Sequence, residues 1–224
     1  MKKDILIIGN GPSTHLISNK FPSLNKSFIT IGTSMAFRYY QKISWWPDYY
    51  ILADSKVVLA QQDEIKNTFL NNDFNLENLY LSYKISGLNH KVINHSPTGY
   101  AALELCKNLE FKNIYLIGIE NTYVEVLNEA RKISFYEKYF RLKIQNLNLP
   151  RKANKLYKIT KTIENNPNYF INDYQQIGDI YSKPNSNSHK KTFDRKIKEL
   201  LDAQINIFDL NPNSTLGLPI KNIF

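Results

Sequence analysis

The sequence predicts an α/β fold in which one parallel β-sheet is covered by helices on both faces. Short apolar runs recur along the 224-residue chain, and amphipathic stretches lie between them. Continuous apolar runs are typical of strands buried on both faces, as in parallel sheets. A glycine-containing turn follows the first run, which favours a Rossmann-like arrangement. The expected strands are residues 4–8, 27–31, 48–53, 77–83, 91–93, 113–118 and 205–210.

Two helices and one insertion complete a single predicted domain over residues 1–224. Apolar residues recur at helical spacing in residues 98–109 and again in residues 192–203. Residues 123–188 differ, because they are polar, basic and rich in tyrosine. We expect them to form a helical, Tyr/Lys-rich lid or insertion on the same domain.

Composition limits the classes of partner. The net charge of +9 suits nucleic acid, an anionic membrane surface or an anionic substrate. The basic run from Arg131 to Lys161 is interpreted as a solvated helix face, or as a contact with phospholipid headgroups or an acidic glycan. Cys106 is the only cysteine, so no internal disulfide is expected. Without a bilayer-spanning stretch or a signal peptide, we expect a cytoplasmic protein, with peripheral association at the inner membrane left open.

The turn after the first strand is the first candidate site. It reads Gly9-Asn10-Gly11-Pro12-Ser13 and is followed by a helix pattern. Glycines let the backbone approach a ligand closely, and Pro12 suits a first helical position. Free amides at that helix start would suit a phosphate, with Asn10 and Ser13 adding hydrogen bonds. The third glycine of the dinucleotide fingerprint is absent, so we expect a nucleotide site other than NAD or FAD.

Three further positions fall near other predicted element ends. Ser96 or Thr98 can cap the helix that follows, and its first amides could bind an anion beside His95. Glu120 follows the strand at 113–118, where a carboxylate can accept hydrogen bonds from a ribose or sugar hydroxyl. His189 precedes the last predicted helix, and an imidazole there can accept a proton at neutral pH.

Metal chemistry is not expected from the motifs. The chain has no Walker A motif, no Cys/His cluster and no Asp-x-Asp pair to hold a divalent ion. A transferase without an Asp-x-Asp pair and its divalent ion suits a leaving group of lower charge, such as a nucleoside monophosphate. We therefore expect no cofactor and no metal.

These motifs together resemble the bacterial sialyltransferases of glycosyltransferase family 42. The turn at 9–13 is similar to the family's opening, and residues 96–100 through 114–120 are similar to its helix and (I/V)YL-x-G-(I/V)D strand. His189, the following helix and strand, and the Pro-Asn-Ser at 212–214 resemble its ending. These motifs follow the same order as in the family across most of the chain, although the stretches between them do not resemble the family.

The resemblance implies a metal-independent, inverting transfer from CMP-sialic acid on a variant GT-A fold. It implies that Asn10 and Ser13 contact the nucleotide and its phosphate. It implies that Thr98 and Gly99 contact the cytidine or the sialic acid carboxylate. The donor-binding set that it implies is Gly9, Asn10, Gly11, Ser13, Thr33, Asp54, His95, Ser96, Thr98, Gly99, Glu120, Asn213 and Ser214.

The resemblance also implies two catalytic roles. His189 would deprotonate the acceptor hydroxyl, and Tyr123 would assist departure of the phosphate. The implied acceptor is a cell-surface glycan or glycolipid such as lipooligosaccharide or capsule. Nucleic acid is not an expected partner, and a homo-oligomer is left open.

Departures from the family pattern cluster around the donor. Thr33 and Asp54 stand where asparagines are expected, Pro97 replaces a threonine and Glu120 replaces an aspartate. Another CMP-nonulosonate, CMP-Kdo or a different nucleotide sugar therefore stays open. The pattern also resembles the motility-accessory-factor glycosyltransferases and a related pterin pyrophosphokinase group. The alternatives are a Mg²⁺-dependent enzyme of the latter kind and a basic module that binds nucleic acid or membrane.

Overall fold

A seven-stranded parallel sheet forms the centre of the computed structural model, which describes residues 4–93, 97–134, 137, 156–183 and 185–223. All six strand pairings within this sheet are parallel, as the apolar runs predicted. The sheet order is β10 (Asn206–Asp209), β6 (Asn113–Ile117), β1 (Asp4–Ile8), β2 (Phe28–Thr33), β3 (Tyr49–Leu52), β4 (Leu79–Leu81) and β5 (Lys91–Val92). Each strand lies within or beside a run predicted from the sequence.

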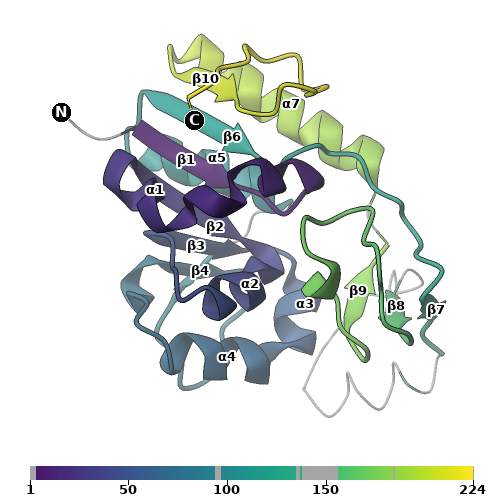
Figure 1. Cartoon of the computed structure of the whole chain (residues 1–224). Helices are drawn as coiled ribbons and strands as arrows, with labels where there is room; N and C mark the ends of the chain where they lie inside the picture. The colour runs from purple at the N-terminus through teal and green to yellow at the C-terminus, as the bar shows by residue number, and fades with distance from the viewer. Residues whose placement is uncertain (1–3, 94–96, 135–136, 138–155, 184, 224) are drawn as a thin grey trace.

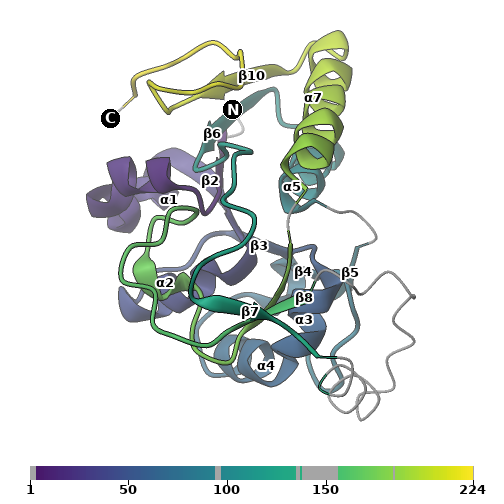
Figure 2. The same ribbon diagram turned by 90° about the vertical axis from the view of Figure 1, so that its right-hand side faces the viewer.

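Helices cover both faces of this sheet (Figures 1 and 2). On β1, Leu6 and Ile8 point into one apolar cluster, and Ile5 and Ile7 point into another on the opposite face. The first cluster includes side chains of α1 (Phe21–Ser27), α2 (Phe37–Lys42), α3 (Ser55–Ala60) and α4 (Gln62–Leu70). The second includes side chains of α5 (Thr98–Asn108) and α7 (Ser186–Asp202).

Aromatic side chains fill much of the first cluster. Phe37, Tyr50 and Phe69 are buried, and their rings meet edge to face or tilted at centroid distances of 5.1–6.3 Å. Such pairs add to the stabilisation from apolar burial. Many of the chain's aromatic residues therefore serve the core rather than a binding surface.

A second, smaller sheet lies beside α3 (Figure 1). Its antiparallel strands are β7 (Ala130–Lys132), β8 (Leu156–Ile159) and β9 (Ile180–Ser182), in that order. Tyr157 and Tyr181 pair across β8 and β9, with their rings stacked at 5.8 Å. In the described part of the predicted insertion at 123–188, these three short strands lie among loops, and the expected helical lid stays a prediction, because residues 138–155 fall outside the described residues.

Several connections contain 3-10 helices. They are η1 (Pro12–Lys20), which has nine residues, and the single turns η2 (Ser34–Ala36), η3 (Leu76–Asn78) and η4 (Asn172–Tyr174). No helix among the described residues combines the length and apolar character that a membrane span requires.

The last helix starts earlier than predicted. α7 begins at Ser186 instead of residue 192, because the Asn185 side chain accepts the Ser188 N–H at 3.0 Å and caps it. His189 therefore lies in the first turns of α7, where its own N–H donates to the Asn185 carbonyl at 2.9 Å. A helix holds this imidazole more rigidly than the loop that we expected.

Candidate functional site

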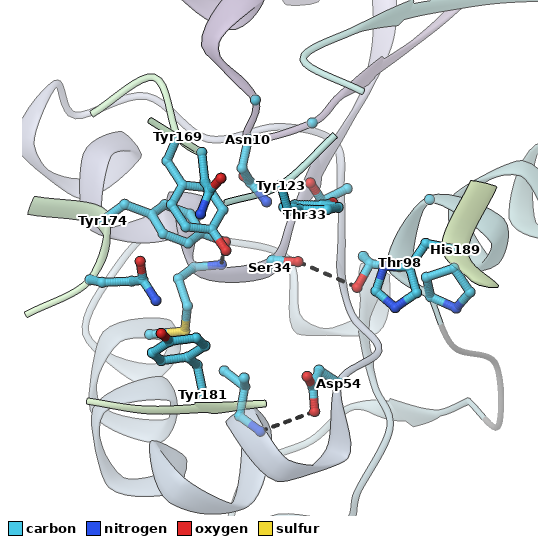
Figure 3. A pocket seen from close by; sticks show the side chains of 18 of the residues that line it. Asn10, Thr33, Ser34, Asp54, Thr98, Tyr123, Tyr169, Tyr174, Tyr181 and His189 are labelled. Atoms are coloured by element: carbon cyan, nitrogen blue, oxygen red, sulfur yellow. Dashed lines mark hydrogen bonds between the residues drawn. The ribbon is translucent and has the colours of Figure 1, made fainter. Parts of the chain in front are cut away.

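One cavity lies between the carboxyl ends of the central strands and β9, which contributes Tyr181 to its lining (Figure 3). Its volume is about 220 Å³. β1 has β2 on one side and β6 on the other, so the chain changes direction across the sheet at this point. Ligands of open α/β sheets bind at such switch points, next to the carboxyl ends of the strands.

Most of the predicted site residues line this cavity. They come from β1–η1, the ends of β2 and β3, the start of α5, the loop after β6, and α7. They are Gly9, Asn10, Gly11, Thr33, Asp54, Thr98, Gly99, Glu120, Tyr123 and His189. Ser13 is buried and does not line the cavity, whereas His95 and Ser96 fall outside the described residues.

The loop after β10 uses two predicted residues for its own structure. The Ser214 hydroxyl donates to the Asp209 carboxylate, and the Asn213 N–H donates to Asn211 Oδ1 at 3.0 Å. Neither Asn213 nor Ser214 lines the cavity. The structure thus does not bring them together with the other predicted donor-binding residues.

The turn after β1 packs against the loop after β6. The Gly9 N–H donates to the Ile117 carbonyl at 2.7 Å, and the Gly11 N–H donates to the Gly118 carbonyl at 2.8 Å. A Cβ on Gly9 would lie 2.1 Å from the Gly118 carbonyl oxygen, closer than any real contact. Glycine is needed here so that two backbone segments can approach each other, rather than to admit a ligand.

The amides of this turn are largely occupied, which disfavours the phosphate site that we expected there. Besides Gly9 and Gly11, the Ser13 N–H donates to Glu120 Oε1 at 2.9 Å and the Thr14 N–H donates to the Gly11 carbonyl at 3.1 Å. A carboxylate thus already satisfies the start of η1, and it would repel a phosphate.

The turn after β1 and the loop after β6 each carry a buried side-chain oxygen without a partner in the described part of the chain. Asn10 Oδ1 and Glu120 Oε2 are buried, and neither has a hydrogen-bond partner among the described residues. A buried oxygen without a partner is costly unless a ligand or water supplies a donor. Both residues line the cavity, so this side of it suits ligand hydroxyl or amino groups.

No side chain of the described residues caps the start of α5, and the Thr98 hydroxyl there has another partner. Pro97 is the N-cap and makes no side-chain cap hydrogen bond, so of the two expected caps Thr98 does not cap this helix, and Ser96 falls outside the described residues. Thr98 instead accepts a hydrogen bond at 3.3 Å from the hydroxyl of Ser34, a cavity residue that the sequence did not point to. Ser34 has a φ of 53°, a strained value for serine, and the Tyr50 hydroxyl donates to its carbonyl at 2.9 Å.

The imidazole of His189 faces the same space (Figure 3). Its ring meets that of Tyr123 edge to face at 6.0 Å. Desolvation lowers the pKa of His189 below 6.5, and the nearby Asp54 carboxylate opposes this only in part. Desolvation, with a smaller contribution from Glu120, raises the pKa of Tyr123. At neutral pH the site therefore pairs a neutral imidazole with a protonated phenol.

Asp54 combines a structural role with its place in the cavity. Its Oδ1 accepts the Lys56 N–H at 2.9 Å and the Val57 N–H at 3.4 Å, which caps α3. The carboxylate therefore stays fixed at the end of β3.

Two tyrosines form the wall opposite His189, and sequence reasoning missed both (Figure 3). Tyr169 and Tyr174 stack at a centroid distance of 3.8 Å, and the Tyr174 hydroxyl accepts the Met35 N–H at 3.0 Å. The preceding Asn168 accepts the Val124 N–H at 2.7 Å and donates to the Val124 carbonyl at 2.9 Å. The wall is thus fixed to η2 and to the loop after β6.

The cavity combines a proton acceptor, a phenol donor, hydroxyls, unpaired acceptor oxygens and an aromatic wall. This set can bind a polar, hydroxyl-rich ligand and can move a proton at His189.

No group of three or more His, Cys, Asp or Glu side chains that could hold a metal occurs in the described part of the chain. Comparisons with protein-family models, curated proteins and solved structures found no match to this chain.

Proposed function

We propose that this chain is a glycosyltransferase that moves sialic acid or a related nonulosonate from a CMP-sugar to a hydroxyl of a surface glycan. The proposal includes inversion at the anomeric carbon, no metal ion, and a variant GT-A fold. The observation that carries it is the neutral His189 imidazole beside the protonated Tyr123 phenol, at the switch point of a parallel sheet. The order of motifs resembling family 42 supports the same reading.

His189 acts as general base in this proposal. Its neutral nitrogen accepts the proton of the acceptor hydroxyl while that oxygen forms a bond to the anomeric carbon. The bond from the anomeric carbon to the phosphate oxygen breaks, and its electron pair leaves with CMP. The Tyr123 hydroxyl donates a hydrogen bond to the departing phosphate. Base catalysis of this kind contributes about 10²–10⁴ in rate.

The nucleoside would lie beside the two unpaired side-chain oxygens described above, which can accept hydrogen bonds. Asn10 Oδ1 and Glu120 Oε2 can accept from ribose hydroxyls, and the Tyr169 ring offers a surface for stacking. The volume of about 220 Å³ is below the ~300–1,000 Å³ of typical ligand pockets. A sugar nucleotide would therefore extend out of the cavity into solvent, where an acceptor glycan can approach it.

We expect CMP to raise the melting temperature more than UMP, UDP, GDP or ATP, with or without Mg²⁺. Ligand at 100 times its Kd stabilises the native state by about 2.7 kcal/mol, so a thermal-shift panel is sensitive enough. The Asn10→Ala variant should lose most of the CMP shift. The Asn213→Ala variant, altered outside the cavity, should keep it.

Other outcomes of this panel separate the alternatives. Stabilisation by ATP that depends on Mg²⁺ would favour a pyrophosphokinase-like enzyme, and a UDP response would favour another nucleotide sugar. A wild-type chain that responds to no nucleotide but binds DNA in a salt-sensitive manner would overturn the proposal in favour of a binding module.

A further inference from the structure

The charges around the cavity are poorly matched to a phosphate. Asp54, Glu120 and Asp179 line it, and of the described lining residues only Lys183 carries a positive charge. The buried Arg38 forms a salt bridge with Asp179 from behind, which neutralises that carboxylate but leaves the guanidinium away from the cavity lining. A nucleotide's phosphate therefore needs a cation that this site supplies only at Lys183.

The turn after β1 offers little compensation. The N–H groups of Gly9, Gly11, Ser13 and Thr14 are already hydrogen-bonded, and Glu120 occupies the start of η1. This turn thus lacks the free amides with which glycine-rich turns usually hold phosphates. The requirement for a cationic side chain becomes correspondingly greater.

Lys183 has the position and the ion pair expected of a cation that binds a phosphate in this cavity. It follows β9 and precedes α7, which carries His189. Its Nζ lies 2.7 Å from Glu125 Oε2, and Glu125 comes two residues after Tyr123 on the neighbouring loop. The adjacent Ser182, which also lines the cavity, has a buried hydroxyl without a hydrogen-bond partner among the described residues.

The ion pair is exposed enough to exchange partners. The two side chains are 36% and 38% exposed, and ion pairs at such positions add little to stability. A lysine has a flexible four-carbon stem, so its ammonium can turn from one anion to another. The phosphomonoester of CMP presents more charge and more acceptor oxygens than the single Glu125 carboxylate.

We propose that Lys183 is the phosphate-binding cation of this cavity, and that Glu125 holds it at the mouth until a nucleotide phosphate displaces the carboxylate. This rests on the proposed function and deepens it, because it assigns neutralisation of the leaving group. The Ser182 hydroxyl donates a further hydrogen bond to the same phosphate. In the transfer step, Lys183 stabilises the charge that arrives on CMP as the glycosidic bond breaks.

The test compares CMP with cytidine, which lacks the phosphate, by calorimetric titration. Hydrogen bonds to charged groups correspond to about 10- to 100-fold in affinity, so Lys183→Met should raise the Kd for CMP by that factor and leave the Kd for cytidine unchanged. Glu125→Gln should tighten CMP binding several-fold. The double variant should match Lys183→Met. Lys107→Met, which removes an exposed ion-paired lysine that does not line the cavity, should bind CMP as the wild type does.

The outcomes separate this inference from the proposed function. If the wild type prefers CMP to cytidine and Lys183→Met keeps that preference, only the role of Lys183 is overturned. Equal weakening of CMP and cytidine would mean a structural role and would also overturn it. If the wild type binds neither CMP, the other nucleotides nor inorganic pyrophosphate, both proposals fail.

Discussion

The His189→Ala variant should lose about 10²- to 10⁴-fold in kcat for transfer from CMP-sialic acid to a galactoside, with little change in its Kd for CMP. The imidazole lies on α7 beside Tyr123, on the opposite wall from the two stacked tyrosines. Removing it takes away the proton acceptor but not the nucleotide contacts that we propose around Asn10. Initial rates of CMP release, with and without the acceptor, measure this directly.

A neighbouring lysine supplies the control. Lys190 follows His189 on the same helix but is exposed, and it pairs with Asp194 one turn later at 3.0 Å. The Lys190→Ala variant should keep wild-type turnover. Wild-type turnover in His189→Ala instead would remove the assigned base.

The pH profile follows from the same imidazole. Desolvation lowers its pKa below 6.5, so the neutral form persists to lower pH than in a solvated histidine. We expect kcat/KM to stay level from pH 7 to pH 8 and to fall as the pH falls through this lowered value. A midpoint above 6.5 would contradict the environment described for His189.

The Arg38→Met variant should lose about 3 kcal/mol in the free energy of unfolding. Arg38 is 4% exposed and donates to both oxygens of Glu64 at 2.7 and 2.6 Å. It also pairs with the Asp179 carboxylate and donates to the Tyr174 carbonyl at 2.8 Å. Removing one partner of a buried ion pair costs about 3–5 kcal/mol, and we take the lower end because Glu64 is 33% exposed.

Urea denaturation of matched variants tests this prediction. Lys42 pairs with Asp173 on the surface, with side chains 56% and 47% exposed, so Lys42→Met should change stability by less than about 1 kcal/mol. Adding Asp179→Asn to Arg38→Met should restore part of the loss, because it removes a carboxylate, 13% exposed, that is left without its cation. Equal stabilities for Arg38→Met and Lys42→Met would contradict the anchoring role of Arg38.

The central sheet could be predicted because its strands leave a strong local signal. The run at residues 4–8 is apolar throughout its buried part, and the same holds for residues 113–117. Strands buried on both faces need no alternation, so length and flanking turns suffice to identify them. The second sheet left no such signal, because β7, β8 and β9 have only 3–4 residues each and mix apolar with polar or charged residues.

The candidate site was predictable in outline only. Gly9, Glu120 and Thr98 were identified because parallel strands bring their carboxyl ends to one edge of the sheet. The sequence could not reveal that Glu120 reaches back to the Ser13 N–H, a contact between residues 107 positions apart. Tyr169 and Tyr174 were missed for a similar reason, since only the tertiary fold turns them toward His189.

Amide chemical-shift mapping with CMP is the most direct test that nucleotide and imidazole share one cavity. On titration of CMP into the ¹⁵N-labelled chain, we expect saturable shifts at Asn10, Thr98, Tyr123 and His189. The loop after β10, including Asn213, should stay unchanged. Shifts confined to that loop or to other surfaces, or no shifts at millimolar CMP, would contradict the account.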